Sequence, residues 1–190
     1  MLTVYLDFKS PAAYLALKPT LALAERLSID IDWQPFRTVE RDIPKLGKDE
    51  TVGESHRRVR AASQRALNQK YARHQGLNLT YPAIIGSTDL ALGVLSEIDG
   101  DKLPFVTASF EAYWREHADL DNAKVVRALL EASGYDHNHD LSNAWEALDR
   151  AQVSAEEAGI VDAPAYVIEE QIFVGREHLP WIEEIARRNA

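Results

Sequence analysis

The sequence predicts an α/β fold in which one small sheet is split by a large all-helical insertion. Residues 1–42 carry strand, helix and strand patterns in turn, and residues 141–190 carry helix, strand, strand and helix patterns. The stretch between them, 43–140, has helical patterns and almost no strand pattern. We therefore expect a discontinuous sheet domain, 1–42 with 141–190, and a helical insertion domain over 43–140.

The opening segment has the pattern of a βαβ unit. Residues 4–8 (VYLDF) carry bulky side chains at both parities, as a strand inside a sheet does. Ser10 is a preferred helix N-cap and Pro11 suits the first helical position, so a buried helix is expected over 12–27. Residues 29–33 (IDIDW) alternate at period two, which is typical of a strand. Such a unit is right-handed, and its two strands are parallel.

The closing segment predicts an antiparallel hairpin between two helices. A helix is expected over 145–158 and a strand over 165–168. A polar turn at 169–170 then leads into a second strand at 172–174, and so short a connection makes the pair antiparallel. The last expected helix covers 178–188.

The middle of the chain is predicted to be helical. Helices are expected over 54–75, 90–98, 104–117 and 122–133. Glycines that punctuate these helices are Gly76, Gly100 and Gly134.

Composition narrows the range of functions. The 21 basic and 30 acidic residues give a net charge of −9, which argues against nucleic acid or an anionic membrane as the main partner. No apolar run is long enough to span a bilayer, and the first residues show no export signal, so we expect a cytoplasmic protein. The chain has no cysteine, which removes disulfides, thiolate metal sites and any redox dithiol.

Three stretches carry a resemblance to a known family. They are DFKSPAAYLAL, which begins at Asp7, FEAYWREHADLDNAKVVRALLEASGYD, which begins at Phe110, and EEAGIVDAPAYVIEEQIFVGREHLPWIEE, which begins at Glu156. In this order they resemble the D-F-x-S-P-x-x-Y-L-A opening, the second block and the closing block of the 2-hydroxychromene-2-carboxylate isomerases and kappa-class glutathione transferases. The resemblance implies a thioredoxin-like fold of the DsbA-like branch.

The chain also departs from this family in four places. Ala13 stands where the family usually has serine, and Val161-Asp162-Ala163-Pro164 stands for F-G-V-P. Gly175-Arg176-Glu177-His178 stands for G-x-D-R. Residues 37–63 fit the isomerases poorly, and in those enzymes this region helps to form the substrate pocket.

Ser10 is the expected catalytic residue. By resemblance, Ser10-Pro11-Ala12-Ala13 occupies the place of the C-x-x-C motif of thioredoxin-like oxidoreductases, but dithiol exchange needs two sulfurs and this stretch has none. A helix N-terminus offers N–H donors and a partial positive charge of about half an elementary charge. A serine hydroxyl placed there can donate a hydrogen bond to the thiolate of an external thiol, and the resemblance makes that thiol glutathione. The alternative is that Ser10 is only a helix cap.

The resemblance also implies the residues that bind glutathione. The backbone of Ala163, before a cis Pro164, would pair with the cysteinyl part of glutathione as an added strand would; without the resemblance a trans bond is expected. Arg176, Glu177 and His178 occupy the positions that bind the γ-glutamyl amine and carboxylate, with Glu177 on the amine and His178 on the carboxylate. The alternative for these residues is an ordinary helix start with an acidic first turn.

Three further polar residues near the junction leave alternatives open. Asp7 lies in a strand that looks buried, so it either supports the site from below or bonds to neighbouring backbone or water. Lys9 would add positive charge to the site, although a solvated surface lysine is the simpler interpretation. Tyr14 is expected to be a core aromatic.

His137 and His139 suggest a solvated loop, and we expect no metal site there.

These observations predict a glutathione-dependent isomerase that resembles 2-hydroxychromene-2-carboxylate isomerase and acts on an unsaturated aromatic pyruvate-type substrate. A glutathione transferase activity is a near variant. The alternative is a cysteine-less DsbA-like protein that binds glutathione or a peptide without catalysis. Relatives in this group often form dimers, so a homodimer is the assembly that the resemblance suggests.

Overall fold

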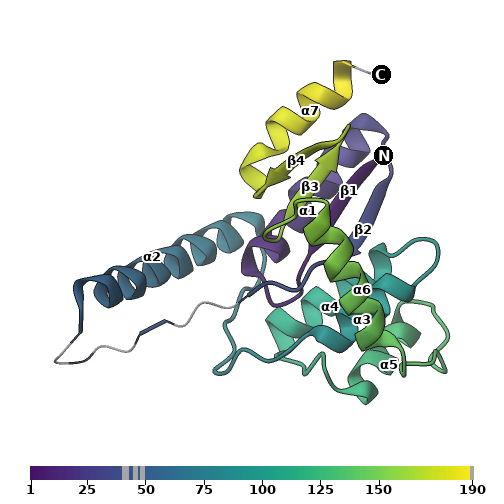
Figure 1. The fold of residues 1–190 in the computed structure, drawn as a ribbon, viewed down its shortest axis with the longest axis horizontal. Helices are drawn as coiled ribbons and strands as arrows, with labels where there is room; N and C mark the ends of the chain where they lie inside the picture. Colours follow the sequence, from purple (N-terminus) through teal and green to yellow (C-terminus); the bar gives the residue numbers. More distant parts are fainter. Residues whose placement is uncertain (40–42, 45–46, 48–49, 189–190) are drawn as a thin grey trace. The chain divides into compact units, whose positions relative to one another are not determined.

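The computed structural model describes residues 1–39, 43–44, 47 and 50–188. One mixed sheet of four strands organises them, in the order β2-β1-β3-β4. The strands are β1 (Leu2–Leu6), β2 (Ile31–Pro35), β3 (Ala165–Ile168) and β4 (Gln171–Val174). As predicted, β1 and β2 are parallel and β3 and β4 are antiparallel; β3 also runs antiparallel to β1 (Figure 1).

Helices cover both faces of this sheet because side chains alternate along each strand. Val4 and Leu6 face α1 (Pro11–Leu27), which packs beside α7 (Leu179–Arg188). Tyr5 points the other way and packs against a buried cluster that includes Ala155 of α6 (Ala144–Glu157). The result is a three-layer arrangement, and it is the thioredoxin-like α/β fold with helices added between β2 and β3 that the sequence predicts.

A buried polar contact fixes α1 to the centre of the sheet. The hydroxyls of Thr20 in α1 and Tyr166 in β3 are hydrogen-bonded at 3.0 Å, and both residues are buried. Burial raises the pKa of Tyr166 to about 12, so its hydroxyl stays protonated at neutral pH and remains available as a donor.

The helices between β2 and β3 have these bounds: α2 (Val52–Gln75), α3 (Asp89–Glu97), α4 (Leu103–Glu111), α5 (Ala123–Ala132) and α6 (Ala144–Glu157). A π-helical turn, Ala112–Glu116, continues α4, so the single helix expected over 104–117 changes its winding before it ends. The glycines at the predicted boundaries, Gly76, Gly100 and Gly134, all have positive φ.

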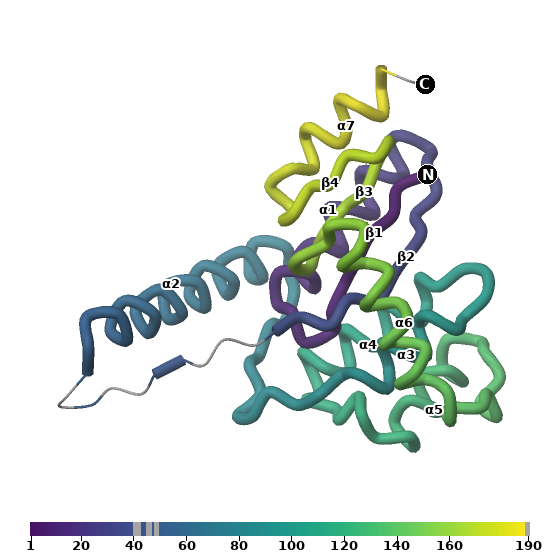
Figure 2. Tube along the Cα trace, in the orientation of Figure 1, coloured from purple at the N-terminus to yellow at the C-terminus, as the bar shows by residue number. Residues whose placement is uncertain are grey.

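The chain divides into two compact units, Met1–Thr38 with Thr80–Ala190, and Val39–Leu79. The first unit holds the sheet together with α3 to α6, which Figure 2 traces in teal and green. The second unit contains α2. These units differ from the expected domains, 1–42 with 141–190 and 43–140, which stay a prediction; residue 42 itself lies outside the described residues. No helix in the described part of the chain is long and apolar enough to cross a membrane.

The first strand lies two residues earlier than expected. It was predicted over 4–8, but β1 ends at Leu6 because the chain then turns: the Ser10 N–H donates to the Asp7 carbonyl at 3.0 Å. The Phe8 carbonyl leaves the ladder and accepts the indole N–H of Trp114 at 2.9 Å. The turn after β1 therefore belongs to the junction with α1, where the candidate site lies.

Candidate functional site

Ser10 is the N-cap of α1. Its Oγ accepts the N–H of Ala13 at 3.2 Å, as a capping serine does, and donates to the carbonyl of Ala163 at 3.1 Å. The side chain is buried, with 8% of the residue exposed. One hydroxyl therefore joins two parts of the chain that are 153 residues apart.

The segment that meets Ser10 contains a cis peptide bond between Ala163 and Pro164, as the family pattern implies. The Ala163 N–H donates to Oδ1 of Asp162 at 2.8 Å, and the Pro164 carbonyl accepts the N–H of Gly175 at 2.8 Å. Both backbone groups of Ala163 are thus bonded within the chain, one to Asp162 and one to Ser10. The fold brings Ser10, Ala163 and Pro164 together, while their role in binding stays a prediction.

Asp7 is completely buried beneath this junction and accepts hydrogen bonds from three segments. Its Oδ1 accepts the Lys9 N–H at 3.1 Å and the Thr88 hydroxyl at 2.8 Å. Its Oδ2 accepts the N–H and the hydroxyl of Thr38 at 2.8 and 2.7 Å. Asp7 thus bonds to neighbouring backbone, one of the two possibilities that the sequence left open, and it also holds the turn that carries Ser10; a role in a functional site stays a prediction.

Lys9 is not a solvated surface lysine, which is the simpler interpretation from sequence. Its side chain is only 13% exposed, and its Nζ lies 3.9 Å from Oδ2 of Asp7. The ammonium group therefore offsets the buried carboxylate, and the two charges together leave little net charge at the junction.

Arg176, Glu177 and His178 form a 3₁₀ turn that precedes α7. Arg176 is half-buried, and its Nη1 lies 3.5 Å from the Leu15 carbonyl in α1, so the turn reaches the same helix as Ser10. Glu177 is exposed, and its carboxylate folds back over Gly175 into the space that a Cβ would occupy; the φ of +94° at Gly175 also favours glycine. The His178 ring lies 5.8 Å from the Phe173 ring. No bond joins Glu177 or His178 to Ser10 among the described residues.

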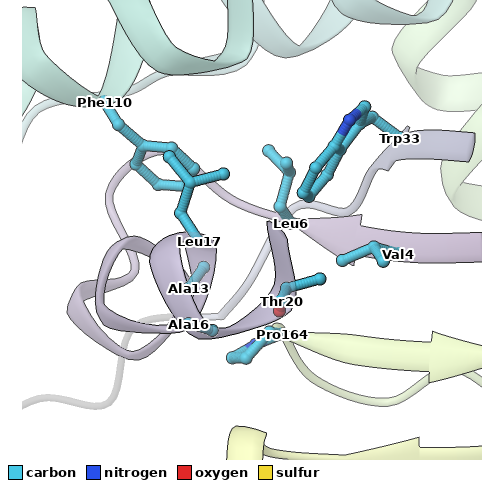
Figure 3. Close-up of a pocket in the computed structure, with 9 residues that line it drawn as sticks. All are labelled: Val4, Leu6, Ala13, Ala16, Leu17, Thr20, Trp33, Phe110 and Pro164. Atoms are coloured by element: carbon cyan, nitrogen blue, oxygen red, sulfur yellow. The ribbon is translucent and has the colours of Figure 1, made fainter. Parts of the chain in front are cut away.

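An apolar cavity of about 10 Å³ lies between α1, the sheet and Pro164 (Figure 3). Its lining is Val4, Leu6, Ala13, Ala16, Leu17, Thr20, Trp33, Phe110 and Pro164. A volume of this size holds about one water molecule, so it is a packing gap and not a substrate pocket. It shows that the wall on the α1 side of Pro164 is apolar.

Aromatic packing holds the junction on the side of the added helices. Tyr14 is buried and stacks on Trp114 with a ring distance of 6.2 Å, which confirms that it is a core residue. Burial raises the pKa of Tyr14, which disfavours a tyrosinate there. Trp114 belongs to the π-helical turn and bonds to the Phe8 carbonyl. The added helices therefore help to set the position of the Lys9–Ser10 turn.

In the loop that was expected to be solvated, His137 is exposed and His139 is partly exposed. Arg127 donates to the carbonyls of His137 and His139 at 2.7 and 3.0 Å, so the loop is held by its backbone. Within the described ranges, no group of three or more acidic or histidine side chains is placed to hold a metal ion.

Sequence reasoning missed three residues that anchor the site, two of them distant in sequence. Thr38 and Thr88 hold Asp7, and Asp162 holds the N–H of Ala163. No local pattern marks the two threonines, because each bonds to a residue 31 or more positions away. Asp162 did carry a signal, since it departs from the family pattern two residues before the predicted cis proline.

Comparison with known proteins agrees with this fold. A family model described as DSBA-like thioredoxin domain matches residues 1–185. Among curated proteins, the 2-hydroxychromene-2-carboxylate isomerase of Sphingobium xenophagum is 28% identical over 187 residues, which cover 94% of each chain.

Solved structures show the same fold. A structure of 2-hydroxychromene-2-carboxylate isomerase superposes with a TM-score of 0.76 at 21% identity, covering 99% of this chain and 95% of that one. A probable DsbA oxidoreductase from Streptomyces coelicolor superposes with a TM-score of 0.71 at 16% identity, covering 100% of this chain and 90% of that one. A putative protein disulfide isomerase from Nitrosomonas europaea superposes with a TM-score of 0.68 at 12% identity, covering 99% of this chain and 97% of that one.

Proposed function

The chain belongs to the DSBA-like thioredoxin domain family, and from that premise we propose that it is a glutathione-dependent isomerase of the 2-hydroxychromene-2-carboxylate type. The proposed substrate is an unsaturated aromatic pyruvate-type acid. The observation that carries the proposal is the position of Ser10, which caps α1 and bonds to Ala163 beside the cis Pro164 in a chain without cysteine. Without a thiol of its own, the chain cannot perform dithiol exchange, so a thiol at this site has to come from a ligand.

The residues around Ser10 fit the sulfur end of such a ligand. The Ala13 N–H holds the oxygen of Ser10, while the single hydroxyl proton is free to rotate from the Ala163 carbonyl towards a sulfur. The N-terminus of α1, a helix of 17 residues, adds about half a positive charge at the same point. Both effects favour an ionised thiol over a neutral one.

Bound glutathione would supply a thiolate that adds to an unsaturated carbon of the substrate, so that a double bond becomes single and rotates; the double bond forms again when the C–S bond breaks and the thiolate leaves. The chain contributes orientation and charge. Ser10 donates to the sulfur, and the Ala163 carbonyl that it leaves accepts an N–H from the ligand. Arg176 is a half-buried cation beside α1 and suits a ligand carboxylate. Glu177, which is exposed, suits the ligand's amine.

A second candidate function is binding of glutathione or a peptide without catalysis. It is favoured by the bonding of Ala163, whose N–H and carbonyl are both engaged by the chain's own side chains. The tight packing behind Pro164, where the cavity measures only about 10 Å³, points the same way. Turnover separates the two functions: absorbance-monitored isomerisation of an aromatic pyruvate-type acid that depends on added glutathione supports the enzyme.

The role of Ser10 is tested with Ser10→Ala and isothermal titration with reduced glutathione. We expect affinity to fall about tenfold, since a hydrogen bond to a charged group is removed. We also expect the pKa of the bound thiol, followed by thiolate absorbance in the ultraviolet, to rise. Unchanged affinity and an unchanged thiolate signal would reduce Ser10 to a helix cap.

Loss of the cap itself needs a matched control, because removal of a capping side chain costs about 0.5–2 kcal/mol of stability. Asn122→Ala provides it, since Asn122 caps α5 in the same unit and accepts the Lys124 N–H at 2.9 Å. We expect this variant to lose similar stability and to bind glutathione as the unmodified protein does.

A further inference from the structure

The two backbone groups of Ala163 are the natural docking points for an extended ligand. Ala163 lies just before β3, so its N–H and carbonyl can pair with a peptide-like chain as one strand residue pairs with another. In this chain, however, both groups already have partners: Asp162 accepts a hydrogen bond from the N–H, and Ser10 donates one to the carbonyl. A ligand that docks here must replace both bonds.

The two partners are chemically different. The Ser10 hydroxyl is neutral, and its proton can turn to the ligand, so that bond is exchanged for another of similar strength. The Asp162 carboxylate is charged, and its 2.8 Å hydrogen bond is stronger than the bond that a neutral ligand carbonyl would form with the same N–H. Displacement of Asp162 is therefore the costly step.

The negative charge of Asp162 also opposes the docking of an anionic ligand. Asp162 is exposed, and within the described part of the chain it has no ion-pair partner. Lys9, the cation next to Ser10, is already paired with Asp7. A ligand with carboxylates or an ionised thiol meets an uncompensated negative charge as it approaches Ala163.

We propose that Asp162 is the specificity-determining residue of this site: it competes for the Ala163 N–H and lowers the affinity for glutathione and other ligands with carboxylates, relative to thiol ligands that carry less negative charge. This inference rests on the proposed function, because it concerns the same ligand position. It also explains how one departure from the family pattern, beside the cis Pro164, retunes the site without changing the fold.

The test compares Asp162→Ala, which removes acceptor and charge, with Asp162→Asn, which keeps an acceptor and removes the charge. Each is titrated calorimetrically with reduced glutathione. We expect affinity to increase from the unmodified protein to Asp162→Asn to Asp162→Ala, the last by about three- to tenfold, the value of one hydrogen bond. Added salt should narrow the gap between the unmodified protein and Asp162→Asn, since that gap is electrostatic.

The matched control is Glu157→Gln. Glu157 is an exposed acid at the end of α6 in the same unit, and its replacement changes the net charge by the same amount. We expect it to leave affinity unchanged. Thermal unfolding of each variant without ligand reports whether the variant still folds. If Asp162→Ala does not fold, Asp162→Asn still tests the inference, because its side chain can still accept the Ala163 N–H.

The outcomes separate this inference from the proposed function. Equal affinity in all variants overturns the role of Asp162 and leaves the glutathione-dependent function standing. Binding by Asp162→Ala but not by the unmodified protein supports the role of Asp162 and removes glutathione as the natural cofactor. Absence of binding in every variant overturns both. An equal gain with Glu157→Gln would show that only net charge matters, which also overturns the role of Asp162.

Discussion

At the scale of single residues, Asp7 is the group on which the junction most depends. A fully buried carboxylate is costly unless it is hydrogen-bonded, and Asp7 receives four hydrogen bonds from Lys9, Thr38 and Thr88. These donors come from the turn after β1, the segment after β2 and the residue before α3. Asp7 therefore ties three segments into one platform beneath Ser10.

Replacement of Asp7 by asparagine tests this platform. The variant places an NH₂ group where only donors point at it, so we expect the free energy of unfolding to fall by about 2–4 kcal/mol in urea denaturation. Asp30→Asn is the control, because Asp30 is an exposed acid just before β2, and there the change should stay within about 0.5 kcal/mol. Equal losses in the two variants would contradict the account.

At the scale of elements, the added helices are held to the sheet by close packing that involves a glycine. Gly93 lies in the middle of α3, and a Cβ built on it would collide with the backbone of Ala144 at the start of α6. The two helices approach this closely because no side chain separates them. Since α3 also contacts β2, this contact helps to position Thr88 against Asp7.

Gly93→Ala should therefore destabilise the protein although alanine favours a helix. Helix propensity alone predicts a gain of about 1 kcal/mol, whereas displacement of packed backbone should cost more than that, with a net loss of about 2–4 kcal/mol. Gly53→Ala in α2 is the matched control, because its Cβ would meet only the end of the Arg57 side chain at 3.7 Å. Thermal or urea unfolding measures the free energy of unfolding of both variants. If Gly93→Ala is as stable as Gly53→Ala, close packing is not the reason for glycine at position 93.

At the scale of the whole molecule, the two compact units differ in burial and charge. In α2, Asn68 and Ala72 are the buried residues, whereas α3 buries six of its nine residues. Residues 39–79 carry nine basic and five acidic side chains, while the rest of the chain carries 12 basic and 25 acidic ones. The acidic net charge of the chain therefore conceals a basic segment.

The difference in burial predicts a difference in local stability. We expect the amides of α2 to exchange with deuterium about a hundredfold faster than those of α3, because opening of α2 exposes little buried surface. Hydrogen–deuterium exchange followed by mass spectrometry measures both helices in one sample. α1, with seven buried residues, serves as a second protected reference. Similar protection in α2 and α3 would contradict this expectation.

Local signals in the sequence determined the elements and the class of fold. Ser10 and Pro11 mark the start of α1, and the alternation at 29–33 marks the parallel strand, which the structure places at β2 (Ile31–Pro35). The strand at 165–168 was predicted with the same bounds that β3 has. The absence of cysteine excluded dithiol chemistry. Each of these signals lies within a few residues of the feature it predicts.

Only the tertiary structure decided how the site is held and what already occupies its bonds. Thr38 and Thr88 reach Asp7 from positions 31 and 81 residues away, and Ser10 reaches Ala163 across 153 residues. Lys9 was expected in solvent but packs against Asp7. Sequence patterns report local backbone preference and the burial of one face, whereas a hydrogen bond between distant segments depends on where the whole chain places them.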